Sequence, residues 1–194
     1  MQILRSFVVH SGRFFDEVIL VSEIERKCQN IQLILSDVDG VLTDGTIWYD
    51  NQCVESKPFH ARDGLGIDLW HLAGYKFGLV TGRSSQIVRH RATELEIAIV
   101  RQGVSDKLET VREILEQMQL TFDQVCFIGD DLPDVLPIRH CTLGVAVADA
   151  VPEVLAAADY VTQQLGGRGA VRETIELILK HHKRWPDIVR RYGG

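Results

Sequence analysis

The chain has 194 residues, 45% of them hydrophobic, and a formal net charge of -6. This length and apolar content predict one domain with its own buried core. The acidic balance argues against nucleic acid or an anionic membrane surface as the main partner, and we expect binding to neither.

Residues 1–30 are interpreted as an N-terminal extension of uncertain structure. They lack the charged start, continuous apolar stretch and small-residue cleavage site of a signal peptide, and no later apolar run reaches the roughly 18 residues of a membrane span. The four cysteines include no C-x-x-C pair, which predicts reduced thiols instead of a zinc site or a disulfide framework. These features indicate a soluble, cytoplasmic protein.

From residue 31 onward, short apolar runs alternate with segments of helical periodicity, a pattern that predicts a parallel sheet covered on both faces. We expect Ser105 to cap the helix that begins near Lys107. The predicted fold class is α/β, a Rossmann-like three-layer sandwich spanning residues 31–180. The runs expected to form its strands are residues 31–36, 76–81, 97–100, 124–128 and 142–147.

Two segments depart from this pattern. Residues 46–59 contain two β runs around the turn-rich Asp50-Asn51-Gln52, which predicts a hairpin projecting from the sheet. Residues 181–194 are rich in lysine and arginine and are interpreted as a basic C-terminal tail. Between Asp39 and Thr81 there is room only for the hairpin and one helix, and between Arg83 and Lys107 only for one helix and a strand, so we expect no cap domain.

The strongest chemical signal is Asp37-Val38-Asp39-Gly40, directly after the first apolar run. Ligands of open α/β sheets bind beyond the carboxyl ends of the strands, so both acids are expected at the edge of a site. Two carboxylates placed two residues apart repel each other unless a cation or a shared proton offsets the repulsion. A divalent metal is the simplest offset, and an acidic turn that caps backbone N–H groups is the alternative.

Two further motifs supply groups that bind phosphate. Thr81-Gly82-Arg83 follows a predicted strand and offers a hydroxyl, a flexible amide and a guanidinium. Lys107 lies in the first turn of a predicted helix, from which it can reach an anion held at the helix N-terminus. Each motif is weak by itself, because similar sequences occur at ordinary turns and on solvated helix faces.

A last acidic motif, residues 129–134, follows another predicted strand. Asp130 is closest to the strand end and is the expected metal ligand. Asp131 and Asp134 are expected to support the site from outside the ligand set, at least one of them as a helix cap. Oxygen ligands that leave positions for water and phosphate favour magnesium over zinc.

In this order and spacing, the four motifs resemble those of the haloacid dehalogenase superfamily of phosphohydrolases. The resemblance implies that Asp37 is a nucleophile that forms an aspartyl-phosphate, and that Asp39 serves as general acid and then as general base. It implies that Thr81 and Lys107 hold the phosphoryl oxygens. Magnesium would be bound by Asp37, Asp130 and the backbone carbonyl of Asp39.

A closer resemblance is to the capless branch represented by the 3-deoxy-D-manno-octulosonate 8-phosphate phosphatases. It covers roughly residues 33–179 and includes Arg62-Asp63-Gly64 and the glycine-rich segment 166–173. This branch implies a small phosphorylated sugar acid as the substrate and a homotetramer whose hairpins form a central barrel. Since the chain has no cap, we expect a neighbouring subunit to help close each site.

Residues around these motifs are predicted to contact the sugar acid, and Arg168 is a candidate lid residue that reaches a neighbour's site. His60 stands where the octulosonate enzymes usually carry a small polar residue, so its contacts are expected to differ. The alternatives are a helix cap for Asp63 and plain solvent exposure for Arg91 and Arg168. The predicted substrate-binding residues are Asp39, His60, Arg62, Asp63, Gly64, Gly82, Arg83, Arg91 and Lys107.

Three functions are weighed. The first is hydrolysis of 3-deoxy-D-manno-octulosonate 8-phosphate, and the second is hydrolysis of a nine-carbon sialic-type acid 9-phosphate, which also combines a carboxylate with a terminal phosphate. The third is a non-catalytic tetramerisation domain of the same fold. The intact set of acids, threonine and lysine argues against the third function.

Overall fold

The computed structural model describes residues 23–194. Most of the N-terminal extension predicted over residues 1–30 therefore lies outside the described residues, and the part inside them includes a helical segment at residues 23–28. Within the described part of the chain, no helix is both long and apolar enough to cross a bilayer.

A six-stranded sheet forms the centre of the molecule, and its order is β5-β4-β1-β6-β7-β8. All neighbouring strands in it are parallel, which confirms the α/β prediction. The two-residue strand β8 was not predicted, because so short a segment carries no measurable periodicity. The strands are β1 (Leu33–Ser36), β4 (Lys76–Thr81), β5 (Ile99–Gln102), β6 (Val125–Gly129), β7 (Leu143–Ala146) and β8 (Tyr160–Val161).

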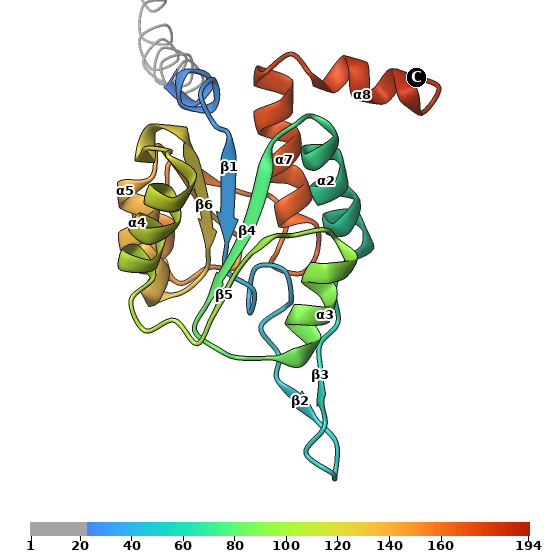
Figure 1. Cartoon of the computed structure of the whole chain (residues 1–194), viewed down its shortest axis with the longest axis vertical. Coiled ribbons are helices and arrows are strands. Elements are labelled where there is room, and N and C mark those ends of the chain that lie inside the picture. Colours follow the sequence, from blue (N-terminus) through green and yellow to red (C-terminus); the bar gives the residue numbers. More distant parts are fainter. Residues whose placement is uncertain (1–22) are drawn as a thin grey trace, which may run out of the picture.

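Helices cover both faces of the sheet (Figure 1). One face carries α2 (Ala61–Leu72), α3 (Gln86–Glu94) and α7 (Ala170–His181), and the other carries α4 (Lys107–Met118), α5 (Val135–His140) and α6 (Pro152–Ala157). Because the central strand β1 is covered on both sides, it is apolar without alternation, and Leu33, Ile34 and Leu35 are fully buried. The short helix α8 (Trp185–Arg191) occupies part of the predicted basic tail.

Chain order places a topological switch point at β1. The chain runs from β1 through α2 to β4 on one side, whereas β6 pairs with β1 on the other side. Crevices for ligands form at the carboxyl edge of such switch points, because the loops there diverge to opposite faces. The residues that follow β1, β4 and β6 therefore converge on one edge of the sheet.

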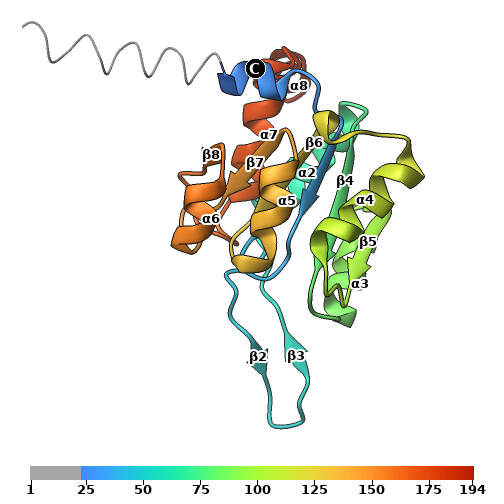
Figure 2. The same ribbon diagram turned by 90° about the vertical axis from the view of Figure 1, so that its left-hand side faces the viewer.

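The predicted hairpin is present. It consists of β2 (Trp48–Tyr49) and β3 (Glu55–Ser56), which pair antiparallel and project away from the carboxyl edge of the sheet (Figures 1 and 2). Asp50 shapes its turn by accepting hydrogen bonds from the backbone N–H groups of Gln52 and Val54. The side chains along the hairpin are largely exposed, Trp48 by 58%.

The helix α4 begins one residue later than the predicted cap implies. Its N-cap is Asp106, whose carboxylate accepts a hydrogen bond of 3.0 Å from the backbone N–H of Glu109. Ser105 is therefore not the cap, because the carboxylate one residue further along satisfies the free N–H group and also complements the positive end of the helix. Lys107 remains in the first turn, as predicted.

Candidate active site

Three carboxylates lie together at the carboxyl edge of the sheet. Asp37 directly follows β1 and Asp130 directly follows β6, and these two strands pair in parallel register up to Ser36 and Ile128. Asp134 approaches from the short 3-10 turn η2 (Leu132–Asp134). One carboxylate oxygen from each of the three aspartates lies within 4.8 Å of the others.

Lys107 contacts two members of this cluster. Its ammonium nitrogen Nζ lies 3.0 Å from Asp37 Oδ2 and 2.6 Å from Asp134 Oδ1. The second oxygen of Asp134 accepts hydrogen bonds from the backbone N–H groups of Asp130 and Asp131. Asp134 therefore joins the lysine to the loop that carries Asp130, which sequence spacing alone did not indicate.

Burial and mutual repulsion change the acidity of these groups. Burial raises the pKa of Asp37 to about 6, with Lys107 opposing the change. Burial and then the charges of Asp37 and Asp134 raise the pKa of Asp130 to about 8. Burial lowers the pKa of Lys107, but the two carboxylates outweigh it and raise this pKa overall. The cluster thus holds more negative charge than its one lysine compensates.

The chemistry of this cluster fits a magnesium ion. Oδ1 of Asp37 and Oδ1 of Asp130 are both buried, and neither has a hydrogen-bond partner among residues 23–194. Buried carboxylate oxygens are costly unless a cation or a donor compensates them, and hard oxygen ligands are those that magnesium prefers. Asp134 supplies a third oxygen to the cluster, although we predicted it outside the ligand set. A contribution from the backbone carbonyl of Asp39 stays a prediction.

The phosphate-binding motif lies beside the cluster. Thr81 is the last residue of β4, which pairs directly with β1. Thr81 is buried, with 2% of its surface exposed. Gly82 and Arg83 continue from it on the surface, and the Arg83 guanidinium Nε lies 3.7 Å from Asp39 Oδ2. The fold therefore brings Thr81, Asp37 and Asp39 to one edge of the sheet, as the sequence predicted.

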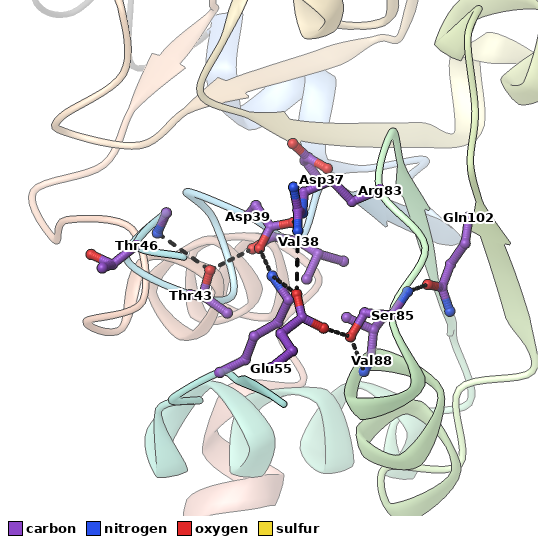
Figure 3. A network of polar contacts seen from close by, with 12 residues as sticks. Asp37, Val38, Asp39, Thr43, Thr46, Glu55, Arg83, Ser85, Val88 and Gln102 are labelled. Carbon is purple, nitrogen blue, oxygen red and sulfur yellow. Dashed lines mark hydrogen bonds and ion pairs between the residues drawn. The ribbon is translucent and has the colours of Figure 1, made fainter. Parts of the chain in front are cut away.

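Asp39 belongs to a second polar network, which reaches the base of the hairpin (Figure 3). Its Oδ1 pairs with the ammonium group of Lys57, a residue that sequence reasoning missed. Lys57 also lies 3.4 Å from Glu55, and Glu55 accepts a hydrogen bond of 2.6 Å from the Ser85 hydroxyl. No spacing signal marks Lys57, because only the fold-back of the hairpin places it near the first motif.

Asp63 has a structural role at the start of α7, and its predicted contact with substrate stays a prediction. It is 1% exposed, and its two oxygens accept hydrogen bonds from the backbone N–H groups of Gly169 and Arg172 at the start of α7. Burial raises its pKa. Asp63 is a cap, but of α7 and not of its own helix. His60 Nδ1 lies 3.9 Å from the same carboxylate.

The remaining predicted sugar contacts lie in two other places. Arg91 forms an ion pair of 2.8 Å with Glu94, stacks over the ring of Phe59 and packs against Gly64. Arg62 and Arg168 line a separate pocket of about 580 Å³ at the start of α7. Arg168 also lies 3.5 Å from Asp44. Within the described chain, no ion pair joins these three arginines to the carboxylate cluster.

The fold and the site define a class of hydrolase. A parallel α/β sheet carries a magnesium-compatible carboxylate cluster, a lysine and a threonine at its carboxyl edge, which is an arrangement suited to metal-assisted attack on an electrophile. Consistent with this class, the sequence profile of the haloacid dehalogenase-like hydrolases matches residues 87–172.

Sequence identity to individual proteins shows which family within this class the chain belongs to. The chain is 43% identical to the 3-deoxy-D-manno-octulosonate 8-phosphate phosphatase KdsC of Yersinia pestis over 160 residues, which is 82% of this chain and 86% of that protein. It is 41% identical to KdsC of Escherichia coli K12 over 81% of this chain and 84% of that one. The chain therefore belongs to the haloacid dehalogenase-like hydrolases, in the family of the 3-deoxy-D-manno-octulosonate 8-phosphate phosphatases.

Solved structures agree with this assignment. The crystal structure of the 3-deoxy-D-manno-octulosonate 8-phosphate phosphatase from Moraxella catarrhalis, in complex with magnesium, phosphate and KDO, superposes with a TM-score of 0.87. The two sequences are 37% identical, and the alignment covers 88% of this chain and 98% of the other. That structure contains magnesium, and the oxygen donors of the carboxylate cluster in this chain suit the same metal.

Proposed function

We propose that this protein is a magnesium-dependent phosphatase that hydrolyses 3-deoxy-D-manno-octulosonate 8-phosphate. The observation that carries the proposal is the buried cluster of Asp37, Asp130 and Asp134, with Lys107 bound between two of its members. The family of relatives acting on this substrate supports the choice of substrate.

In this mechanism Asp37 is the nucleophile. Its Oδ1 is free of hydrogen bonds among the described residues, which leaves that oxygen available for attack on phosphorus or for the cation. The bond from phosphorus to the sugar oxygen breaks, and an aspartyl-phosphate forms on Asp37. Asp39 gives a proton to the leaving alkoxide and then accepts one from the water that hydrolyses the aspartyl-phosphate.

The remaining residues of the site bind the phosphoryl group and the magnesium ion and compensate their charges. Lys107 and Thr81 are proposed to bind the phosphoryl oxygens, and Lys107 also keeps Asp37 and Asp134 from repelling each other. Asp37, Asp130 and the carbonyl of Asp39 would hold magnesium, with Asp134 beside them. When bound, the ion would screen the phosphate charge from the carboxylates that surround it.

The proposal also covers the residues that contact the sugar acid and the assembly of subunits. Arg83 is the predicted sugar-binding arginine nearest to Asp39, and its guanidinium is exposed enough to meet a carboxylate. We include Gly82 in this contact, and His60, Arg62, Gly64 and Arg91 as further candidates. The exposed hairpin supports a homotetramer in which Arg168 acts on a neighbouring site.

Phosphate release with magnesium tests this proposal. The protein is assayed with a panel that includes the eight-carbon 8-phosphate, a nine-carbon sialic-type 9-phosphate and common sugar phosphates, with Asp37→Asn as the inactive control. We expect the highest kcat/KM for the eight-carbon ester. A higher value for the nine-carbon ester would reject the substrate assignment, and no release from any ester would indicate the non-catalytic assembly domain.

A further inference from the structure

Lys57 is an unusual residue for the base of an exposed hairpin. Its side chain is 1% exposed, although the hairpin around it is largely open to solvent. Lysine is almost never fully buried unless it is paired. Its partners are Asp39 Oδ1 and Glu55 Oε1, so the ammonium group lies between two carboxylates from separate segments.

Asp39 is held by cations on both of its oxygens. Lys57 pairs with Oδ1, and the Arg83 guanidinium Nε lies 3.7 Å from Oδ2. The two cations differ, because the Arg83 side chain is 45% exposed and also donates a hydrogen bond to the Tyr49 hydroxyl. The buried ammonium group is therefore the fixed contact, and the guanidinium is the one that a ligand can reach.

Glu55, which holds Lys57, is itself fixed by Ser85 from the body of the domain; Figure 3 shows Glu55, Ser85 and Gln102 in this network. Glu55 accepts a hydrogen bond of 2.6 Å from the Ser85 hydroxyl, and the Ser85 backbone N–H donates to the Gln102 side chain at 2.5 Å. The Ser85 hydroxyl also caps α3 by accepting from the backbone N–H of Val88. A chain of contacts thus connects the loop after β4 and the last residue of β5 to the Asp39 carboxyl group.

We propose that Lys57 is a positioning residue: it pairs with Oδ1 of Asp39 and so orients the carboxyl group for transfer of a proton carried on Oδ2 to the leaving oxygen. This inference rests on the proposed function, because it assigns Lys57 a part in the acid step of that reaction. Its ammonium group faces Asp39 and Glu55, so its effect on the reaction passes through Asp39. A displaced acid loses rate steeply, since proton transfer requires hydrogen-bond distance.

The test compares two esters that differ in their need for an acid. An alkyl ester such as the sugar 8-phosphate leaves as a basic alkoxide and needs a proton, whereas p-nitrophenyl phosphate leaves as a stable phenolate. The measured quantity is kcat/KM with saturating magnesium, because it reports the steps up to the first irreversible one, departure of the leaving group. Hydrolysis of the aspartyl-phosphate therefore does not mask the comparison.

We expect Lys57→Met to lower kcat/KM for the sugar phosphate by about 10- to 100-fold and for p-nitrophenyl phosphate by less than about 3-fold. Asp39→Asn should show the same preference with a larger loss. Lys57→Gln keeps an N–H donor, so we expect the same preference between esters with a smaller loss of kcat/KM. It serves as the second variant if Lys57→Met folds poorly. Gln52→Ala, at the exposed turn of the same hairpin, is the control and should show no ester preference.

Suppose that Asp39→Asn lowers kcat/KM more for the sugar phosphate than for p-nitrophenyl phosphate. Equal losses of kcat/KM on both esters in Lys57→Met, or no loss on either, would then overturn the role of Lys57. If Asp39→Asn lowers kcat/KM equally for both esters, the role of Lys57 is also overturned. Turnover by the wild-type protein would still support the proposed phosphatase activity in that case. A wild-type protein that hydrolyses neither ester would overturn both proposals together. Thermal unfolding of each variant confirms that the compared proteins are folded.

Discussion

Gly40 shows why the first acidic motif needs a glycine. Its φ of +94° lies in the left-handed region, and a β-carbon built there would collide with the carboxylate of Asp130. A glycine is therefore required at position 40 for two reasons, the backbone conformation and the close approach of the Asp130 side chain, which is proposed to bind magnesium. The motif and Asp130 are 90 residues apart in sequence but share this contact.

Gly40→Ala is expected to weaken magnesium binding by about 10-fold or more, because Asp130 must move to make room. Isothermal titration calorimetry with magnesium measures this affinity. Gly45→Ala is the matched control, since Gly45 also has a positive φ of +74° but its β-carbon would meet only atoms at 3.5 Å or more. Equal magnesium affinity in the two folded variants would contradict the account.

The convergence of Asp37, Thr81, Lys107 and Asp130 could be predicted from the sequence, because each lies at the end of a predicted strand or the start of a helix and parallel strands end at one edge. Lys57 could not be predicted, since its contact with Asp39 depends on how the hairpin folds back. The placement of Asp134 in the cluster depends on the tight turn η2, whose geometry the spacing does not determine.

At the scale of elements, α7 is attached to the start of the described chain through one histidine. His182 caps the C-terminal end of α7, and its Nε2 lies 2.7 Å from the carbonyl oxygen of Cys28, which it reaches as a donor. The ring also packs beside Trp70 and Tyr75, and its Nδ1 is buried without a partner among residues 23–194. Protonation would place a second N–H group where the described residues offer no acceptor.

This contact predicts a pH dependence of stability. Burial lowers the pKa of His182 below its usual 6.5, although the bond to Cys28 opposes this; the nearby Arg184 and His181 lower it further. The unfolded chain then binds a proton more readily than the folded one as pH falls through 6.5, so the stability contributed by His182 is lost on that side. Stability at higher pH is unaffected by this proton.

Denaturant unfolding at pH values above and below 6.5 measures the effect. We expect His182→Gln to lose less stability on acidification than the wild-type protein, because glutamine can donate to Cys28 without titrating. His90→Gln on the exposed face of α3 is the control. Identical pH dependence in His182→Gln and the wild-type protein would rule out this role.

Element boundaries were predicted less well than element types. The strand expected over residues 97–100 begins two residues later, at Ile99, and the cap of α4 moves from Ser105 to Asp106. Ile97 is nonetheless buried, so its apolar character reflects core packing before the strand begins. Apolar runs identify what is buried, whereas hydrogen bonds determine where a strand or helix starts.

At the scale of the whole molecule, the hairpin leaves a concentrated apolar surface at one end. Trp48, Tyr49 and Val54 are each more than half exposed, and this end lies opposite α8 and the C-terminus (Figure 1). A two-stranded hairpin with exposed aromatic side chains gains little stability alone, so burial against another copy is favourable.

We predict that Trp48→Glu lowers the mass of the assembly in solution, because a carboxylate at the hairpin face opposes its burial between subunits. Size-exclusion chromatography with light scattering measures the mass. Leu136→Glu is the matched control, since Leu136 is comparably exposed at 52% but lies on α5. A wild-type monomer, or a Trp48→Glu variant with unchanged mass, would contradict hairpin-mediated assembly.

The most direct test of the account is to trap the phosphorylated protein. The enzyme is mixed with magnesium and the sugar 8-phosphate, quenched in acid during turnover, digested, and the peptides analysed by mass spectrometry. We expect the peptide containing Asp37 to carry one added phosphoryl group, and the same peptide of Asp37→Asn to carry none. Continued phosphate release with the phosphoryl group on another residue, or on no residue, would show that Asp37 is not the nucleophile.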